Sequence, residues 1–157
     1  MLTLLKKENM GRIIAIDYGR KRCGIAVTDI LRICANGLPT VRTCDIFDFI
    51  QIYISSEPVD EIVIGEPKDL KGNPSDSMKY INPFIQRLHK EFPDLSIKMF
   101  DERFTSTIAH QEMIAGGFKK KTRENKGKTD EMAAVLILTS YLESLRERSL
   151  QKKSNDI

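Results

Sequence analysis

The sequence lacks any long hydrophobic run. Its apolar stretches are all much shorter than the roughly 18 residues that a membrane-spanning helix requires. The first ten residues hold only one apolar stretch, Leu2 to Leu5, which charged residues follow without a small-residue cleavage site. We therefore expect a cytoplasmic protein in which residues 1–10 form an N-terminal extension.

Sulfur and nitrogen ligands for metals are also scarce. The three cysteines, Cys23, Cys34 and Cys44, include no closely spaced pair, so neither a disulfide framework nor a zinc site is predicted. Two histidines are too few for a zinc enzyme. With 157 residues, of which 41% are hydrophobic, the chain fits one domain, which we place at residues 11–148, followed by a polar tail over 149–157.

Positive charge is concentrated in one short segment. Residues 119–128 carry a net charge of +5, whereas the whole chain carries +3. Such a run is often only a solvated loop. It directly precedes a helix that is expected to begin at Asp130, and an anionic polymer lying across that acid would also cross the run. We therefore predict that nucleic acid contacts Lys119, Lys120, Lys121, Arg123, Lys126 and Lys128.

The first part of the chain predicts antiparallel strands. Residues 12–17 form a largely apolar strand, and a turn leads to a second strand over 22–28. A third short strand is expected at 32–35 or at 40–43, because Asn36-Gly37 and Pro39 separate the two segments. These segments predict a three-stranded antiparallel unit.

Helices and strands alternate in the rest of the chain. A helix over 45–55 leads to a strand over 61–65. A helix over 78–92, which Pro83 should kink or restart at Asn82, leads to a strand over 96–100. Crossover helices make the later strands parallel to the first one. This order predicts an α/β fold, in which a five-stranded mixed sheet has its first strand at the centre and helices on both faces.

Two more helices are expected near the C-terminus. One begins near Thr105 or Thr107 and ends at Gly116-Gly117. The last helix runs from Thr129, as its N-cap, to about Arg148. The polar residues after Arg148 are expected to fray.

Acidic residues lie at the C-terminal ends of the strands that are expected to be parallel. They are Asp17, Glu66, Asp101 and Glu102. Such ends share one edge of a sheet, and the helix start at Asp130 is expected nearby. Crowded carboxylates are costly unless cations gather them, and oxygen ligands without His or Cys favour Mg²⁺ or Mn²⁺. The residues therefore predict a metal-dependent phosphoryl-transfer enzyme.

Four motifs in order resemble the YqgF/RuvX family. They are the run from Asp17 to Asp29, the turn Ile64-Gly65-Glu66-Pro67, the segment Asp101-Glu102-Arg103-Phe104-Thr105-Ser106, and the run from Lys126 to Ala134. The resemblance spans roughly Gly11 to Leu142. It implies an RNase H-like fold and a nuclease that matures the 5′ end of pre-16S ribosomal RNA. The family is also described as a Holliday junction resolvase.

The resemblance also implies roles for single residues. Asp17, Glu102 and Asp130 would be the catalytic, metal-binding acids, with Asp101 as an additional candidate. Arg22, Arg103 and the basic segment 119–128 would contact phosphates, while Gly19 and Gly24 would let the backbone approach the metal edge. Two Mg²⁺ or Mn²⁺ ions would hydrolyse a phosphodiester, one by activating water and one by stabilising the leaving oxygen. Glu66 replaces a usually apolar residue and is either an extra acid of the site or a surface substitution.

Two other functions fit parts of the sequence. The residues from Asp17 to Gly24 also resemble the first phosphate loop of the actin and sugar-kinase superfamily, but such enzymes need a second domain for which 157 residues leave no room. A non-catalytic nucleic-acid-binding module would need only the basic segment, and metal-dependent cleavage of an oligonucleotide distinguishes a nuclease from it. RNA is favoured over branched DNA as the substrate, and both a monomer and a homodimer stay open.

Overall fold

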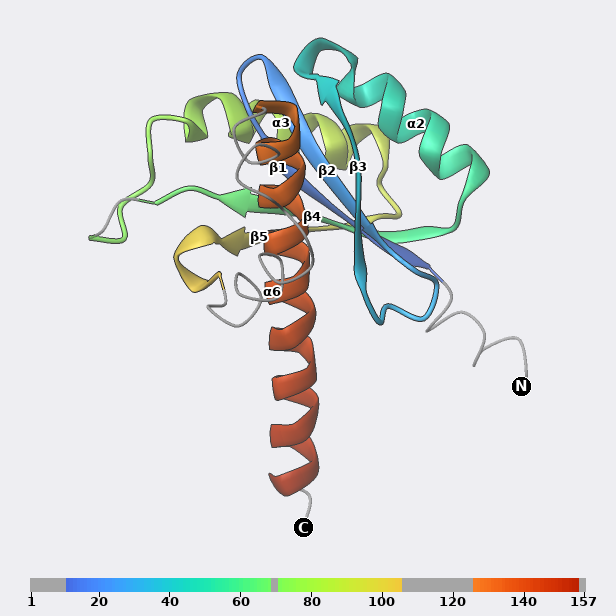
Figure 1. Cartoon of the computed structure of the whole chain (residues 1–157), viewed down its shortest axis with the longest axis vertical. Helices are drawn as coiled ribbons and strands as arrows, with labels where there is room; N and C mark the ends of the chain where they lie inside the picture. Colours follow the sequence, from blue (N-terminus) through green and yellow to red (C-terminus); the bar gives the residue numbers. More distant parts are fainter. Residues whose placement is uncertain (1–10, 69–70, 106–125, 156–157) are drawn as a thin grey trace.

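The computed structural model describes residues 11–68, 71–105 and 126–155. Within these ranges, five strands form one mixed sheet in the order β3-β2-β1-β4-β5 (Figure 1). Strand β2 (Arg22–Thr28) is antiparallel to both of its neighbours, β1 (Arg12–Tyr18) and β3 (Ala35–Arg42), whereas β4 (Val59–Glu66) and β5 (Ser96–Asp101) run parallel to β1. The predicted mixed sheet with a central first strand is confirmed.

Strand β3 differs from both predicted positions. It runs through Asn36-Gly37 and Pro39, which the sequence had suggested as breaks. Because β3 is an edge strand, the missing backbone donor of Pro39 need not leave a ladder position unpaired. The pairing with β2 also shifts register between Cys23 and Ile25, and such irregularities are where proline is tolerated in a sheet.

Helices cover both faces of the sheet, as predicted. A 3₁₀ turn, η1 (Thr43–Asp45), leads into α2 (Ile46–Ser56), and α3 (Met78–Glu91) follows β4. The long helix α6 (Lys126–Asn155) crosses the opposite face and projects beyond the sheet (Figure 1). Pro83 lies inside α3 without dividing it, so of the two predicted effects at Asn82 the restart is wrong, and the kink stays a prediction.

Alternate residues of β1 fill two separate cores. Ile14 and Ile16 pack against α2 and α3, whereas Ile13 and Ala15 pack against α6. All four are fully buried, and burying an isoleucine side chain stabilises a fold by roughly 2 kcal/mol. Because strand side chains alternate between faces, Asp17 shares the α6 face with Ile13 and Ala15.

A buried polar pair joins α6 to β4. The hydroxyl of Tyr141 donates a hydrogen bond to the carboxylate of Glu61, which is 7% exposed. The ammonium of Lys98 lies 3.5 Å from the same carboxylate. The pair therefore fixes α6 across the strand that ends at the candidate site.

The last helix is longer than expected at both ends. It begins at Lys126, so Thr129 lies inside the helix and is not its N-cap. It continues to Asn155, seven residues past Arg148, because the polar residues after Arg148 include no glycine or proline that would stop it. No helix in the described part of the chain is long and apolar enough to cross a membrane. The helix predicted to end at Gly116-Gly117 lies largely outside the described residues.

Candidate active site

The acids that were predicted to meet do lie at one edge of the sheet. Strands β1, β4 and β5 are parallel, so their C-terminal ends point the same way. Asp17 is the penultimate residue of β1, and Glu66 and Asp101, the last residues of β4 and β5, are register partners. Glu102 opens the 3₁₀ turn η2 (Glu102–Phe104) directly after β5.

Two glycines flank Asp17 and leave room for acids from other elements. Gly24 on β2 is its register partner, and Gly65 lies at the corresponding level on β4. A side chain at Gly24 would collide with the backbone carbonyl of Asp130, and a Cβ at Gly65 would lie 2.6 Å from a carboxylate oxygen of Glu102. The two glycines therefore allow α6 and η2 to approach Asp17 from opposite sides.

The charges of these acids affect one another. Burial and the negative charge of Asp130 raise the pKa of Asp17 from 3.8 to about 6. Burial and the charges of Asp17 and Asp101 raise the pKa of Glu102 from 4.5 to about 7. Carboxyl groups that resist ionisation in this way repel one another when charged, and a bound divalent cation would offset this repulsion.

Asp130 is held by an arginine from the far end of the sequence. The guanidinium of Arg22, the first residue of β2, forms an ion pair with the Asp130 carboxylate, and their side chains are 40% and 25% exposed. The pair borders a cavity of about 640 Å³, which is lined by Gly19, Arg20, Lys21, Arg22 and Asp130. Positive charge therefore lies directly beside Asp130, where a phosphate group would be attracted.

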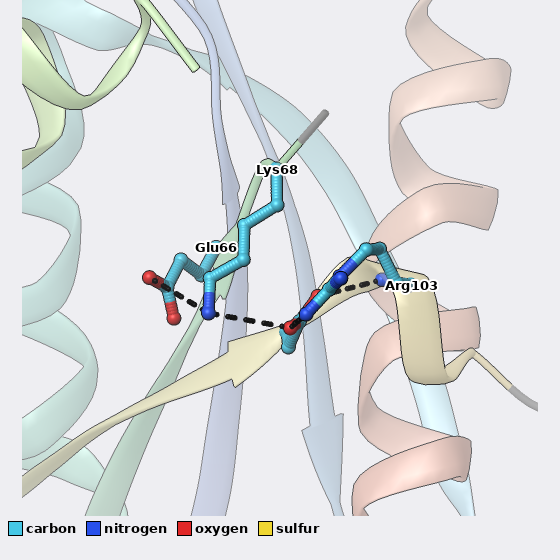
Figure 2. A network of polar contacts seen from close by, with 4 residues as sticks. Glu66, Lys68 and Arg103 are labelled. Atoms are coloured by element: carbon cyan, nitrogen blue, oxygen red, sulfur yellow. Dashed lines mark hydrogen bonds and ion pairs between the residues drawn. The ribbon is translucent and has the colours of Figure 1, made fainter. Parts of the chain in front are cut away.

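Asp101 is neutralised by two cations, unlike Glu102. Its carboxylate accepts hydrogen bonds from the backbone and the guanidinium of Arg103, at 2.9 Å and 2.8 Å, and lies 3.3 Å from the ammonium of Lys68. These contacts hold its pKa well below the usual range. Lys68 also lies 3.6 Å from Glu66, so it bridges the ends of β4 and β5 (Figure 2). Glu66 is thus placed at this edge and is paired with a cation there.

The donor atoms of this edge suit a hard divalent cation in kind, because Asp17, Glu102 and Asp130 offer only carboxylate oxygens. The three carboxylates are not close enough together to form a complete metal site. Among the described residues, no three His, Cys, Asp or Glu side chains lie close enough together to hold a metal ion. Asp130 is directed to Arg22, and this ion pair keeps its carboxylate engaged.

The predicted nucleic-acid contacts are placed only in part. Arg22 lines the cavity, and Arg103 is turned to Asp101, although its side chain is still 37% exposed. Lys119, Lys120, Lys121 and Arg123 lie outside the described residues, as do the side chains of Lys126 and Lys128. Gly19 closes the turn between β1 and β2, where a side chain would collide with the Arg22 carbonyl.

Two residues of this edge, Lys68 and Gly65, were given no role from the sequence. Lys68 bridges Glu66 and Asp101, and Gly65 admits Glu102. A lysine two residues after an acidic strand end was the available signal for the bridge. The available signal for Gly65 was a glycine at the end of a strand whose preceding residues, Ile62, Val63 and Ile64, are all buried.

Comparisons with known proteins identify the family. The family model RuvX, described as a Holliday junction resolvase, matches residues 11–144. The chain belongs to the RuvX family. A relative from Phocaeicola vulgatus is 53% identical over 135 residues, which cover 86% of this chain and 97% of the relative. A relative from Bacteroides thetaiotaomicron is 53% identical over 137 residues, with coverage of 87% and 99%.

These two RuvX relatives, and one from Flavobacterium johnsoniae that is 47% identical over 137 residues with coverage of 87% and 99%, are each named "Putative pre-16S rRNA nuclease". Among solved structures, Archaeoglobus fulgidus Pelota aligns with 99% of this chain and 43% of its own, at 13% identity and a TM-score of 0.41. This structural similarity is too low to support a shared fold or function.

Proposed function

We propose that this RuvX-family chain is a nuclease that hydrolyses phosphodiester bonds during maturation of the 5′ end of pre-16S ribosomal RNA. The observation that supports the proposal is that Asp17, Glu102 and Asp130 come from three separate elements, that the charge of Asp130 acts on Asp17 and the charge of Asp17 on Glu102, and that Asp130 lines a basic cavity. The names of the relatives support rRNA as the substrate. Such a role would place the protein in the cytoplasm.

Asp17 and Glu102 are the residues that would hold Mg²⁺ or Mn²⁺. Their raised pKa values mean that a cation replaces repulsion with attraction at this point. When bound, divalent ions supply activation of a water molecule and stabilisation of the leaving oxygen. Asp130 would be the third ligand once its carboxylate is not paired with Arg22.

Asp101 has a different proposed task from Glu102. Its contacts with Arg103 and Lys68 occupy its hydrogen-bond acceptor sites and neutralise its charge. It caps η2 by accepting the backbone hydrogen bond of Arg103, so it fixes the turn on which Glu102 lies. We therefore infer that Glu102 binds the cation and that Asp101 positions it.

The substrate would be bound by basic residues near the acids. Arg20, Lys21 and Arg22 follow one another along the turn that lines the cavity, and arginine can donate two hydrogen bonds to one phosphate. The basic segment 119–128 precedes Asp130 in the sequence and would extend this contact along the strand. We propose RNA as the polymer, in a monomer or a homodimer.

A Holliday junction resolvase is the second candidate, because the matching family model carries that description. It would use the same acids on branched DNA, and symmetric cleavage of a junction would require two copies of the site. A non-catalytic nucleic-acid-binding module is the third candidate.

Parallel cleavage assays separate these candidates. Purified protein with Mn²⁺ is incubated with labelled pre-16S leader RNA and with a four-way DNA junction. We expect cleavage of the leader, and a loss on the order of 100-fold or more with Asp17→Asn. Asp94→Asn, an exposed acid in the turn before β5, is the matched control and should retain activity. Cleavage of the junction alone would favour the resolvase, and binding without cleavage of either would contradict the nuclease.

A further inference from the structure

Arg22 lies in a crowd of positive charges. It follows Arg20 and Lys21 in the sequence, and its register partner on β3 is Arg42. Side chains directly opposite each other on antiparallel strands lie close together, and like charges there repel. Asp130 is the acid that is ion-paired with Arg22 in the described part of the chain. An anion is therefore needed to offset the charge of Arg22, and in this structure the Asp130 carboxylate is that anion.

The backbone that carries Asp130 has little freedom to move. Its carbonyl packs directly on the Cα of Gly24, and Ala134 and Leu138 of the same helix are fully buried against the sheet. Any change in the partner of Asp130 must therefore come from side-chain rotation. Arg22 can supply this rotation, because its side chain is 40% exposed and borders the cavity of about 640 Å³.

The charge of the cavity lining suits an anion such as a phosphate diester. The lining residues Arg20, Lys21 and Arg22 carry three positive charges against the one negative charge of Asp130. A phosphate bound by Arg22 would keep the arginine neutralised without the carboxylate. Asp130 would then be repelled by the incoming phosphate while its own cation is withdrawn.

We propose that Arg22 exchanges the Asp130 carboxylate for a nucleic-acid phosphate, so that substrate entering the cavity releases Asp130 to the neighbouring metal-binding acids. In the free protein the ion pair keeps the third ligand engaged, and the metal site is incomplete. Substrate and divalent cation therefore strengthen each other's binding. The inference rests on the proposed function for the identity of the metal site, but the exchange itself can be measured without catalysis.

Binding of RNA in EDTA tests the phosphate side of the exchange. Affinity for a labelled single-stranded RNA of about 12 nucleotides is measured by fluorescence anisotropy in the full chain. Asp130→Asn frees Arg22 and should tighten binding by about 5-fold, whereas Asp17→Asn removes a similar negative charge without freeing the arginine and should have a smaller effect. In an Arg22→Gln background, the advantage of Asp130→Asn over Asp17→Asn should vanish.

Binding of Mn²⁺ without RNA tests the metal side. The free ion is followed by electron paramagnetic resonance, and melting temperatures check that each variant is folded. Arg22→Gln should tighten Mn²⁺ binding by about 5-fold because it releases Asp130. Lys21→Gln is the matched control, since Lys21 lines the same cavity and is the adjacent cation. It should give a clearly smaller gain, and Asp130→Asn should abolish the gain of Arg22→Gln. Arg22→Lys, which keeps the charge, should lie between the wild type and Arg22→Gln.

The outcomes distinguish this inference from the proposed function. Equal gains for Arg22→Gln and Lys21→Gln, or equal effects of Asp130→Asn and Asp17→Asn on RNA, would overturn the exchange and leave the nuclease proposal intact. A wild-type protein that binds no Mn²⁺ and cleaves no leader would overturn the metal-dependent function. In that case the RNA measurements would still decide whether Arg22 changes partners.

Discussion

Replacing Asp17 with asparagine should stabilise the metal-free protein at neutral and alkaline pH. The half-buried carboxylate of Asp17 faces the negative charge of Asp130, and its pKa is raised from 3.8 to about 6. The folded state therefore holds a proton more tightly than the unfolded state. Ionisation of Asp17 costs stability, and asparagine of the same shape avoids that cost.

The expected size follows from the pKa difference. One pKa unit corresponds to about 1.4 kcal/mol, so a rise from 3.8 to about 6 sets an upper limit of about 3 kcal/mol in the free energy of unfolding. The actual gain should be on the order of 1–2 kcal/mol, because solvent screens part of the repulsion and the half-buried amide also needs hydrogen-bond partners. Stability of the wild type should fall as the pH rises from about 4 to about 6 and then level off with respect to Asp17.

Urea unfolding followed by circular dichroism, in EDTA and across a pH series, measures this effect. The difference between Asp17→Asn and the wild type should be small near pH 4, should grow up to about pH 6, and should stay constant at about pH 8. Asp94→Asn is the control and should show no such growth. If Asp17→Asn is less stable than the wild type at about pH 8, Asp17 stabilises the fold through hydrogen bonds, and the electrostatic reasoning is refuted.

Three further predictions concern other parts of the chain. Gly24→Ala should lower the melting temperature more than Gly65→Ala, because the new methyl group meets helix backbone in the first variant and only side-chain ends in the second. Each replacement should lower the free energy of unfolding by about 1–3 kcal/mol, and equal losses would contradict the tight contact between Gly24 and the helix. Tyr141→Phe should cost about 1–3 kcal/mol in urea unfolding, because it leaves the buried carboxylate of Glu61 without its hydroxyl donor, and an unchanged midpoint would show that the bond adds nothing. If about four charges of segment 119–128 contact a single RNA strand, the logarithm of the affinity for leader RNA, measured with Ca²⁺ present, should fall with the logarithm of the salt concentration at a slope near −3. Neutral replacements in the segment should make this slope shallower. An unchanged slope would show that the segment is only a solvated loop.

The sequence by itself determined the fold class and the sheet edge at which the acids of the strand ends lie. Ile13 to Ile16 are all apolar, which indicates a strand covered on both faces, and both faces of β1 are indeed buried. Crossover helices require the later strands to run parallel to β1, so Asp17 and the acids after β5 had to share one edge. These conclusions depend on local periodicity and chain direction, which neighbouring residues encode.

Element ends were predicted less well, because they depend on neighbours in space. The edge position of β3 tolerates Pro39, which the sequence had suggested as a break. No stop signal ends α6 near Arg148, and polar composition alone had suggested the end there.

Only the tertiary structure decided which cation neutralises which acid. Asp101 and Glu102 are adjacent in the sequence, yet Lys68 and Arg103 engage Asp101 and leave Glu102 in the field of Asp17. Asp130 and its partner Arg22 are 108 residues apart. Ion pairs depend on distances of a few ångströms between side-chain tips, and these distances are set only when the elements pack. The sequence could therefore place the acids of the strand ends at one edge, but it could not show that arginines engage Asp101 and Asp130.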